Sequence, residues 1–540
     1  MKRFLEITMT NLIDIDTNDA AKFRLIGQTV STYRCAIPYT SEIFLGDLLA
    51  IHDSQKQFTF YAKVTGMQHA SNFSDANWDT RPHTSHFYNL GEDVFLLLEA
   101  TPLGYLDQNG NFRRPKTVPT KFSSVRIAEE EDFAFLEEYM GKIEVGLVRN
   151  GTGTIATAKV GLHPHDLNQH MGVFATTGMG KSNFMKVFSA SCMKEQPFGL
   201  LMVDPHGEYL KGRSAPGGGE NPGLIHYREG RGGLAIFSTR DEQAIKRYGA
   251  STLSIAYDDF RPSDLYPIFE FSEAQSEILE TLSDISGSVL IDFFSATDFT
   301  EDWYDGYAGT NPPLARRLKE FHEASLRSIK RKLEILTRHN PFFRRSGSSL
   351  NGIRRALEEQ KVVLIDIPGM REQSELFILS LLTRTFLNER RNDGFGADET
   401  EPAGQVLIAI EEAQRVLGPG RGTAVFRECA MEGRKFGIGL CVITQQPKNI
   451  DPRILAQINT YVVLGLSDKT DRQMIASSAK QDLTALDGEI QTLERGEAVI
   501  STLSVPFPIS CRIHAFDRYI KQDDMKKTNP IRDGLKNSFS

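Results

Sequence analysis

The sequence predicts an α/β protein with a mainly parallel central sheet, preceded by a small β-barrel and interrupted by a helical bundle. From about residue 146, apolar runs of strand length alternate with helical stretches, which is typical of a parallel sheet buried on both faces. Before that point, short β-rich runs are separated by turns, which is typical of a small barrel. We therefore expect a barrel over residues 1–145, a core over 146–518 with the helical insertion at about 258–355, and a polar tail over 519–540.

The composition is that of a soluble protein with more than one domain. A chain of 540 residues exceeds what a single hydrophobic core usually holds. Its net charge of -8 gives no overall attraction to nucleic acid, so any such contact has to come from local basic surface. No signal peptide or long apolar run occurs, and the cysteines lack metal-ligand spacing. We expect a cytoplasmic protein with reduced, buried thiols at Cys35, Cys192, Cys429, Cys441 and Cys511.

The N-terminal region carries strand and turn signals without a catalytic constellation. Strands are expected over Phe58–Val64 and Val94–Leu98, and a turn over Asp107–Asn111. Two interpretations stay open for the predicted barrel. It is either a module that recruits a partner or a structural cap on the core.

Polar residues follow several predicted core strands at the point where each strand ends. Asp204 follows Phe198–Val203, two glutamates follow Val406–Ile410, and two glutamines follow Ile438–Thr444. In open α/β sheets, ligands bind at the carboxyl ends of the strands. We therefore expect the binding site at this edge of the sheet.

Residues 175–182 (Ala-Thr-Thr-Gly-Met-Gly-Lys-Ser) predict a phosphate-binding loop between a strand and a helix. The two glycines allow the backbone to curl, so that N–H groups point at phosphate oxygens. Lys181 places a positive charge against the β- and γ-phosphates of ATP, and Ser182 offers a hydroxyl ligand to Mg²⁺. Ala175 replaces the first glycine of the usual pattern. The predicted nucleotide-binding residues are Thr177, Gly178, Met179, Gly180, Lys181, Ser182 and Asn183.

Four further positions complete the predicted ATPase chemistry. Glu411 is assigned to Mg²⁺ through water, and Glu412 to the attacking water, although two acids at a helix start also suit the helix dipole. Gln445 is a candidate sensor of the γ-phosphate, with a turn glutamine as the alternative. Arg434 is a candidate for reaching the γ-phosphate of a neighbouring subunit, with a structural salt bridge as the alternative.

The predicted helical insertion combines an apolar face with a basic one. Leu326, Ile329, Leu333 and Leu336 recur at helical spacing. Residues 311–345 hold ten Lys or Arg against three acids, leaving a charge of +7. This asymmetry indicates either a solvated helix face or a surface for DNA phosphates or an acidic partner.

The chain resembles the HerA-type ATPases of the HerA–FtsK group. The resemblance spans residues 172–515 and rests on Thr177–Asn183, Val203–Tyr209, Ile410–Gln414, Glu432–Gly437, Thr444–Pro447 and Leu493–Ala498. It implies a RecA-like P-loop core, a homo-hexameric ring and ATP-driven movement of double-stranded DNA. It also implies a partner on the barrel side, either a NurA-type nuclease or an antiphage effector such as a nuclease or sirtuin-type NADase.

Some positions depart from the family pattern. Glu411 replaces a common aspartate, Gln414 a frequent histidine and Gln446 a frequent arginine, and Gln169 stands where relatives often carry arginine. None of these changes removes a group essential for hydrolysis.

The leading hypothesis is a ring-forming DNA translocase or helicase, with Arg421 as a candidate pore residue. The alternatives are a hexameric scaffold that activates an effector enzyme, and a P-loop machine that moves something other than DNA. The roles of Asp204, His206 and Glu208 stay open between catalysis and loop packing.

Overall fold

The computed structural model describes residues 23–71, 94–121, 123–167, 169–214, 220–308, 312–392, 404–419 and 424–527, which fall into two compact units. The first unit runs to Glu137 and includes Asn150–Gly153. The second unit contains Glu138–Arg149 and the chain from Thr154 onward. Residues 143–145, expected in the barrel, instead begin a strand of the core sheet.

The first unit is a closed antiparallel β-barrel of six strands, as the turn-rich sequence predicted. Strand order is β2-β1-β7-β3-β4-β5, and the ring closes because β2 also pairs with β5. The short β6 extends β5 through a hairpin in which Gly110 donates its N–H to Asp107 O at 2.9 Å. The strands are β1 (Phe23–Gln28), β2 (Tyr33–Pro38), β3 (Leu48–Asp53), β4 (Phe58–Ser71), β5 (Val94–Leu106), β6 (Phe112–Arg113) and β7 (Ser124–Ile127).

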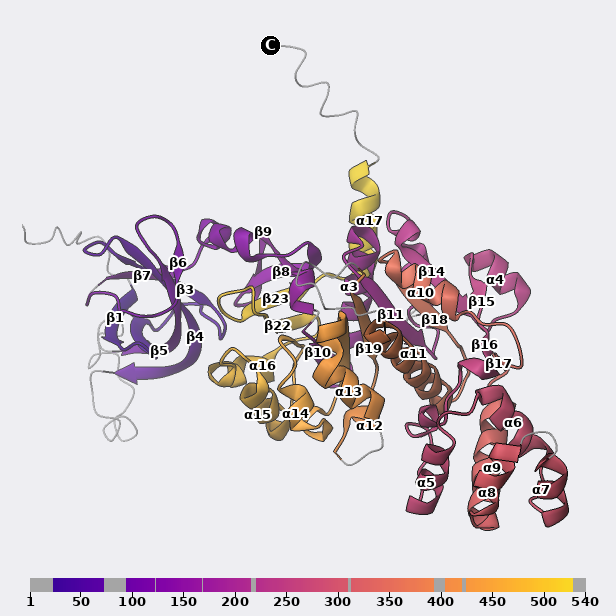
Figure 1. Cartoon of the computed structure of the whole chain (residues 1–540). Helices are drawn as coiled ribbons and strands as arrows, with labels where there is room; N and C mark the ends of the chain where they lie inside the picture. The colour runs from indigo at the N-terminus through magenta and orange to yellow at the C-terminus, as the bar shows by residue number, and fades with distance from the viewer. Residues whose placement is uncertain are drawn as a thin grey trace, which may run out of the picture. The chain divides into compact units, whose positions relative to one another are not determined.

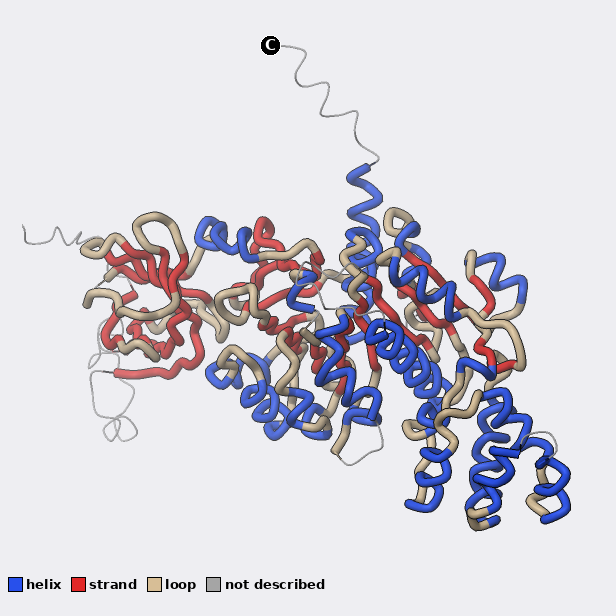
Figure 2. The backbone as a smooth tube through the Cα atoms, in the orientation of Figure 1, coloured by secondary structure: helices blue, strands red, loops and turns tan. Residues whose placement is uncertain are grey.

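The second unit is built on a sheet of twelve strands, eight of which form a continuous parallel run (Figures 1 and 2). The buried apolar runs of the sequence become its central strands, which confirms the predicted α/β core. In sheet order, the parallel strands are β15 (Ser251–Thr252), β14 (Leu234–Ser238), β18 (Val362–Asp366), β11 (Gly199–Asp204), β19 (Val406–Ile410), β20 (Ile438–Thr444), β10 (Met171–Phe174) and β21 (Thr460–Val463).

The sheet continues beyond β21 with an extension that the sequence did not reveal. Strands β22, β23 and β8 join it through antiparallel pairings, and β9 lies at the edge. Ion pairs stabilise this extension of the sheet: Arg512 bonds Glu497 at 2.8 Å, and Arg149 bonds Glu489. The strands are β22 (Glu497–Ser501), β23 (Ile509–Ile513), β8 (Ile143–Asn150) and β9 (Gly153–Leu162).

Helices pack against this sheet and connect its strands. Helix α3 begins at the predicted phosphate loop, α10 packs against β11 and β18, and α13 packs against β20. The main connecting helices are α3 (Lys181–Glu195), α4 (Glu242–Tyr248), α10 (Leu350–Glu358), α11 (Glu372–Asn392), α12 (Gln414–Leu417), α13 (Ala424–Glu432), α14 (Pro452–Leu455), α15 (Lys469–Ser478) and α16 (Asp487–Thr492).

The helical insertion forms a cluster in which α5 and α6 pack on α9, and α7 packs on α8 (Figure 1). The four apolar residues predicted to share one face of α9 are all buried. Many of its basic side chains have local partners: Arg317 bonds Asp284 at 2.7 Å, and Lys332 lies 4.0 Å from the Phe271 ring centre. The helices are α5 (Glu273–Thr281), α6 (Gly287–Ala296), α7 (Glu301–Ala308), α8 (Pro312–Lys319) and α9 (Glu323–His339).

The expected tail is wrong for its first residues, because helix α17 runs from Phe516 to Lys527. Phe516, Tyr519 and Ile520 are buried, and the helix packs against α3. Their spacing of three and four residues places them on one helix face, although charged neighbours give the segment a polar composition.

All five cysteines are free and buried, as expected. Of the helices that the structure describes, none combines the length and apolar character that a membrane span requires.

Candidate active site

The predicted phosphate loop connects β10 to α3 at the carboxyl edge of the parallel sheet. Gly178 and Gly180 have φ values of 86° and 107°, which side chains with a Cβ rarely adopt. Ala175 is fully buried and donates its N–H to Thr444 O at 3.3 Å. Alanine therefore fits at the place of the usual first glycine, and the two remaining glycines provide the curvature of the loop.

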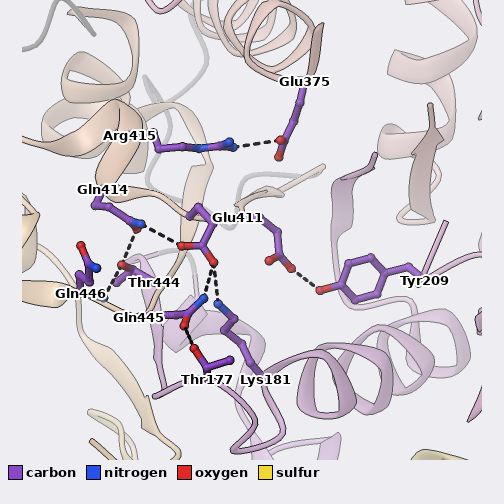
Figure 3. A network of polar contacts seen from close by, with 11 residues as sticks. Thr177, Lys181, Tyr209, Glu375, Glu411, Gln414, Arg415, Thr444, Gln445 and Gln446 are labelled. Atoms are coloured by element: carbon purple, nitrogen blue, oxygen red, sulfur yellow. Dashed lines mark hydrogen bonds and ion pairs between the residues drawn. The ribbon is translucent and has the colours of Figure 1, made fainter. Parts of the chain in front are cut away.

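Three side chains from separate elements meet beside this loop (Figure 3). Lys181 Nζ lies 3.1 Å from Glu412 Oε1, and Gln445 Nε2 donates to the same oxygen at 2.8 Å. The other end of the Gln445 amide accepts a hydrogen bond from Thr177 Oγ1. The structure thus joins the loop, the strand end of β19 and the strand end of β20 around one carboxylate.

The second Glu412 oxygen is also held. Gln414 Nε2 donates to Glu412 Oε2 at 2.8 Å, and Thr444 Oγ1 donates to Gln414 Oε1 at 2.6 Å. Burial alone would raise the pKa of Glu412, but these amide hydrogen bonds and the charge of Lys181 outweigh it and lower that pKa below its usual value. Glu412 is therefore a fixed anion at neutral pH.

The backbone at Glu412 is strained, with φ at 44°. Such left-handed geometry at a residue other than glycine is uncommon and concentrates at functional sites, where the surrounding structure maintains it. Here it follows directly on the end of β19 and turns the Glu412 side chain toward Lys181.

Glu411 lies in a different environment from its neighbour. It is partly buried, and this desolvation raises its pKa; it accepts a hydrogen bond from the Tyr209 hydroxyl (Figure 3). The loop that carries Tyr209 is held by Asp204, whose carboxylate accepts N–H groups from Glu208, Tyr209 and Leu210 at 2.9–3.0 Å. The Asp204 side chain thus has a loop-organising role, which was one of the two alternatives left open.

These residues surround a cavity of about 890 Å³, which is large enough for a nucleoside triphosphate. His206, Glu208 and Asn221 also reach it. Arg415 lines the cavity but is bonded to Glu375 at 3.0 Å and Glu372 at 2.6 Å. Three permanent cations therefore face five carboxylates across the space: Lys181, Arg415 and Arg495 against Asp204, Glu208, Glu375, Glu411 and Glu412.

Two predicted site residues have other surroundings. The Asn183 amide donates to His514 O at 2.8 Å and accepts the Phe516 N–H at 3.0 Å, so its side chain anchors the segment before α17. Arg434 is exposed at the amino end of β20, whereas the phosphate loop follows the carboxyl end of parallel β10. The structure therefore does not bring Arg434 to the Lys181 of its own chain. Arg421 lies outside the described residues.

Comparison with known proteins identifies this architecture. Residues 143–386, which carry the phosphate loop and five strands of the parallel sheet, match the family model for the central domain of helicase HerA. This chain is an ATPase that is similar to helicase HerA. A probable helicase of Methanocaldococcus jannaschii is 25% identical over 406 residues, covering 72% of this chain and 74% of that protein. The DNA double-strand break repair helicase HerA of Sulfolobus acidocaldarius is 23% identical, covering 78% of each chain.

Among solved structures, the plasmid coupling protein TrwB in complex with a GTP analogue is similar at 15% identity. The match covers 66% of this chain and 88% of TrwB, with a TM-score of 0.46.

Several residues of this site were not predicted from the sequence. Gln414 and Thr444 complete the shell around Glu412, and Tyr209 contacts Glu411. The signal for Gln414 was its place two residues after Glu412. Tyr209 and Arg495 belong to segments quoted for the family resemblance, but neither was given a role.

The donor set fits a magnesium ion that is bound mainly through nucleotide. Within the described part of the chain, no cluster of three metal-ligating side chains occurs. Ser182 and Glu411 both line the cavity and supply oxygen donors. Mg²⁺ is usually held by one or two carboxylates together with substrate phosphates and water, and this donor set matches that pattern.

His170, directly before β10, makes stability depend on pH. Its ring accepts the Leu440 N–H at 2.9 Å, and burial, with a smaller contribution from the Arg434 charge, lowers its pKa to about 4. An unfolded chain binds this proton near its ordinary pKa of about 6.5, so protonation favours unfolding. The contribution of neutral His170 to the free energy of unfolding is complete above pH 6.5. About 3 kcal/mol of that contribution is lost as the pH falls toward 4.

We therefore expect the free energy of unfolding of wild type to fall more steeply between pH 7 and pH 4.5 than that of His170→Asn. Asparagine also tolerates the positive φ of 64° at this position. Denaturant unfolding at several pH values measures both slopes. Equal slopes would show that His170 titrates normally in the folded chain.

Proposed function

We propose that this HerA-type ATPase uses ATP hydrolysis to move along or unwind double-stranded DNA. The observation that carries the proposal is the convergence of Lys181 and Gln445 on one carboxylate oxygen of Glu412 beside the phosphate loop. The relatives named as HerA DNA double-strand break repair helicases, with coverage of about four fifths of this chain, support DNA as the substrate.

In the proposed reaction, Lys181 exchanges Glu412 for a phosphate oxygen when ATP enters. The Glu412 carboxylate, still held by Gln414 and Gln445, then orients the attacking water. Its lowered pKa suits it to positioning water and stabilising charge more than to removing a proton early. Gln445 also contacts Thr177, so it links the phosphate loop directly to the water-orienting group.

Ser182 and Glu411 would hold Mg²⁺, which would neutralise charge on the β- and γ-phosphates. The Tyr209 hydroxyl donates a hydrogen bond to the Glu411 carboxyl and so fixes its orientation. Thr177–Asn183 would contribute backbone N–H groups to the phosphates, and the side chain of Asn183 would keep its contacts with residues 514 and 516.

A ring of identical subunits supplies the charge that one chain lacks. Five carboxylates face three cations in the cavity, and two of those cations are already paired. An arginine from a neighbouring subunit would offset the charge of the triphosphate. Arg434 is exposed and lies just before β20, at the amino end of the parallel strands and away from the phosphate loop of its own chain, which supports action across an interface.

Arg434→Ala is expected to lower the ATP turnover rate about a thousand-fold, because an arginine that stabilises transition-state charge contributes at least that much. Mixing Arg434→Ala with Lys181→Ala subunits tests action between subunits. Part of the activity should return, since a mixed interface combines one intact Lys181 with one intact Arg434. Mixed rings as inactive as either parent would contradict the proposal.

A partner enzyme on the barrel completes the proposal. The barrel forms a compact unit of its own, and this supports a role in recruiting an effector. We propose a nuclease or an antiphage effector as that partner, in a hexameric assembly that acts in DNA-end processing or antiphage defence. Size determination of the chain alone and with the protein encoded beside it tests this assembly.

The decisive experiment for function is the ATPase rate with and without linear double-stranded DNA. A translocase predicts a several-fold rise in turnover when DNA is added to the chain alone, and none with Lys181→Ala. If DNA has no effect and turnover rises only with the partner protein, the chain is instead a scaffold that assembles an effector.

A further inference from the structure

A turn in the C-terminal part of the core lies directly against the phosphate loop. Residues 493–496 connect α16 to β22, and Gly496 donates its N–H to Met179 O at 3.2 Å. A Cβ built on Gly180 would lie 3.6 Å from Gly496 N. Gly496 itself has φ at 85°, which favours glycine at this contact. The residue before it, Arg495, is thereby placed at the wall of the nucleotide cavity.

The backbone of this turn is held on its other side as well. Ile513 donates its N–H to Gly496 O at 2.8 Å, and Glu494 donates its N–H to Glu497 Oε2 at 2.9 Å. Arg512 Nη1 lies 3.4 Å from Arg495 O. The main chain at Arg495 is therefore fixed relative to the phosphate loop and to two strands.

The side chain of Arg495 is exposed and lines the cavity together with Gly180 and Ser182. No carboxylate among the described residues lies within ion-pair distance of its guanidinium. The nearby Glu497 is already bonded to Arg512 at 2.8 Å. Of the three permanent cations facing the cavity, Lys181 and Arg415 have acid partners, and Arg495 is the one left available to an anion.

We propose that Arg495 is a nucleotide-binding residue that binds the phosphate groups of ATP and ADP. The guanidinium fork suits phosphate oxygens, and its charge offsets part of the excess of carboxylates around the cavity. Thr177 contacts Gln445 on the side of the attacking water, whereas Gly180 contacts the turn that carries Arg495. Arg495 is therefore assigned to the phosphates nearer the ribose, which ATP and ADP share. This assignment rests on the proposed ATPase function.

The test compares nucleotide affinity in Arg495→Ala, Arg495→Lys and wild type. Arg495→Ala should weaken the affinity for fluorescent ADP about ten-fold, as expected for a charge-assisted hydrogen bond in a partly exposed site. The KM for ATP should rise by a similar factor while kcat stays within about two-fold, because the contact exists in ground and transition states alike. Arg495→Lys should recover part of the affinity. Arg518→Ala, an exposed arginine on α17, is the matched control and should bind ADP as wild type does.

Thermal unfolding without nucleotide separates binding from folding. Arg495→Ala should unfold at the wild-type temperature, because its guanidinium has no acid partner among the described residues. Unchanged ADP affinity in Arg495→Ala would overturn the assignment while leaving the proposed function intact. Loss of DNA-stimulated turnover with unchanged ADP affinity would also overturn it, in favour of a contact with DNA or a second subunit. Failure of the proposed function would appear instead as wild-type turnover in Lys181→Ala.

Discussion

Replacing Lys181 with alanine is expected to lower ATP turnover by at least about a hundred-fold, the effect of removing one essential charge stabiliser. Lys181 Nζ lies 3.1 Å from Glu412 in a side chain that is only 14% exposed, at the first residue of the helix that follows the phosphate loop. Without the ammonium, five carboxylates face only two cations, both arginines. We therefore expect ATP affinity and turnover to fall together, in a steady-state assay and in equilibrium binding.

The matched control for this substitution is Lys246→Ala on α4, an exposed lysine that is absent from the cavity wall. It should keep wild-type turnover. The contact between Lys181 and Glu412 is one pair in a network, so the unfolding temperature of Lys181→Ala should stay close to wild type. Turnover that persists in a folded Lys181→Ala protein would remove the assigned site.

Replacing Glu412 with glutamine is expected to separate binding from hydrolysis. Turnover should fall by about 10² to 10⁴, because the group that orients the water loses its charge. ATP affinity should be no weaker than in wild type, since Lys181 no longer has to leave an ion pair at 3.1 Å to meet a phosphate. Rapid-mix turnover together with binding of fluorescent ATP measures both quantities.

Gln414→Ala serves as the comparison for Glu412→Gln. It removes the hydrogen bond that Gln414 Nε2 donates to Glu412 Oε2 at 2.8 Å, but leaves the carboxylate in place. Its effect on turnover should therefore be clearly smaller than that of Glu412→Gln. Near-wild-type turnover in Glu412→Gln would show that this carboxylate does not serve the water.

The parts of the fold that depend on local sequence were predictable. The phosphate loop, its flanking strand and helix, and the acid pair after β19 all follow from short segments. Hydrophobic periodicity also identified the buried face of α9. These features need only the preferences of neighbouring residues.

The parts that depend on distant pairing were not predictable from these signals. β8 joins the core sheet by pairing Val148 with Cys511, more than 360 residues away, and no local pattern reports such a partner. The Tyr209–Glu411 contact and the backbone hydrogen bond from Gly496 to Met179 likewise join segments far apart in the chain. The prediction of a polar tail was wrong for another reason. The charged residues of this segment made it look polar, although Phe516, Tyr519 and Ile520 have the spacing of a buried helix face.

In the proposed site, the phosphate loop and Glu412 act on the same nucleotide. An experimental structure with a non-hydrolysable ATP analogue and Mg²⁺ tests it most directly. We expect Lys181 Nζ to lie against the γ-phosphate, and the Glu412 carboxylate to face a water in line for attack while still bonded to Gln414. A γ-phosphate that lies on the loop, with Glu412 turned away and out of reach of that water, would contradict the shared site.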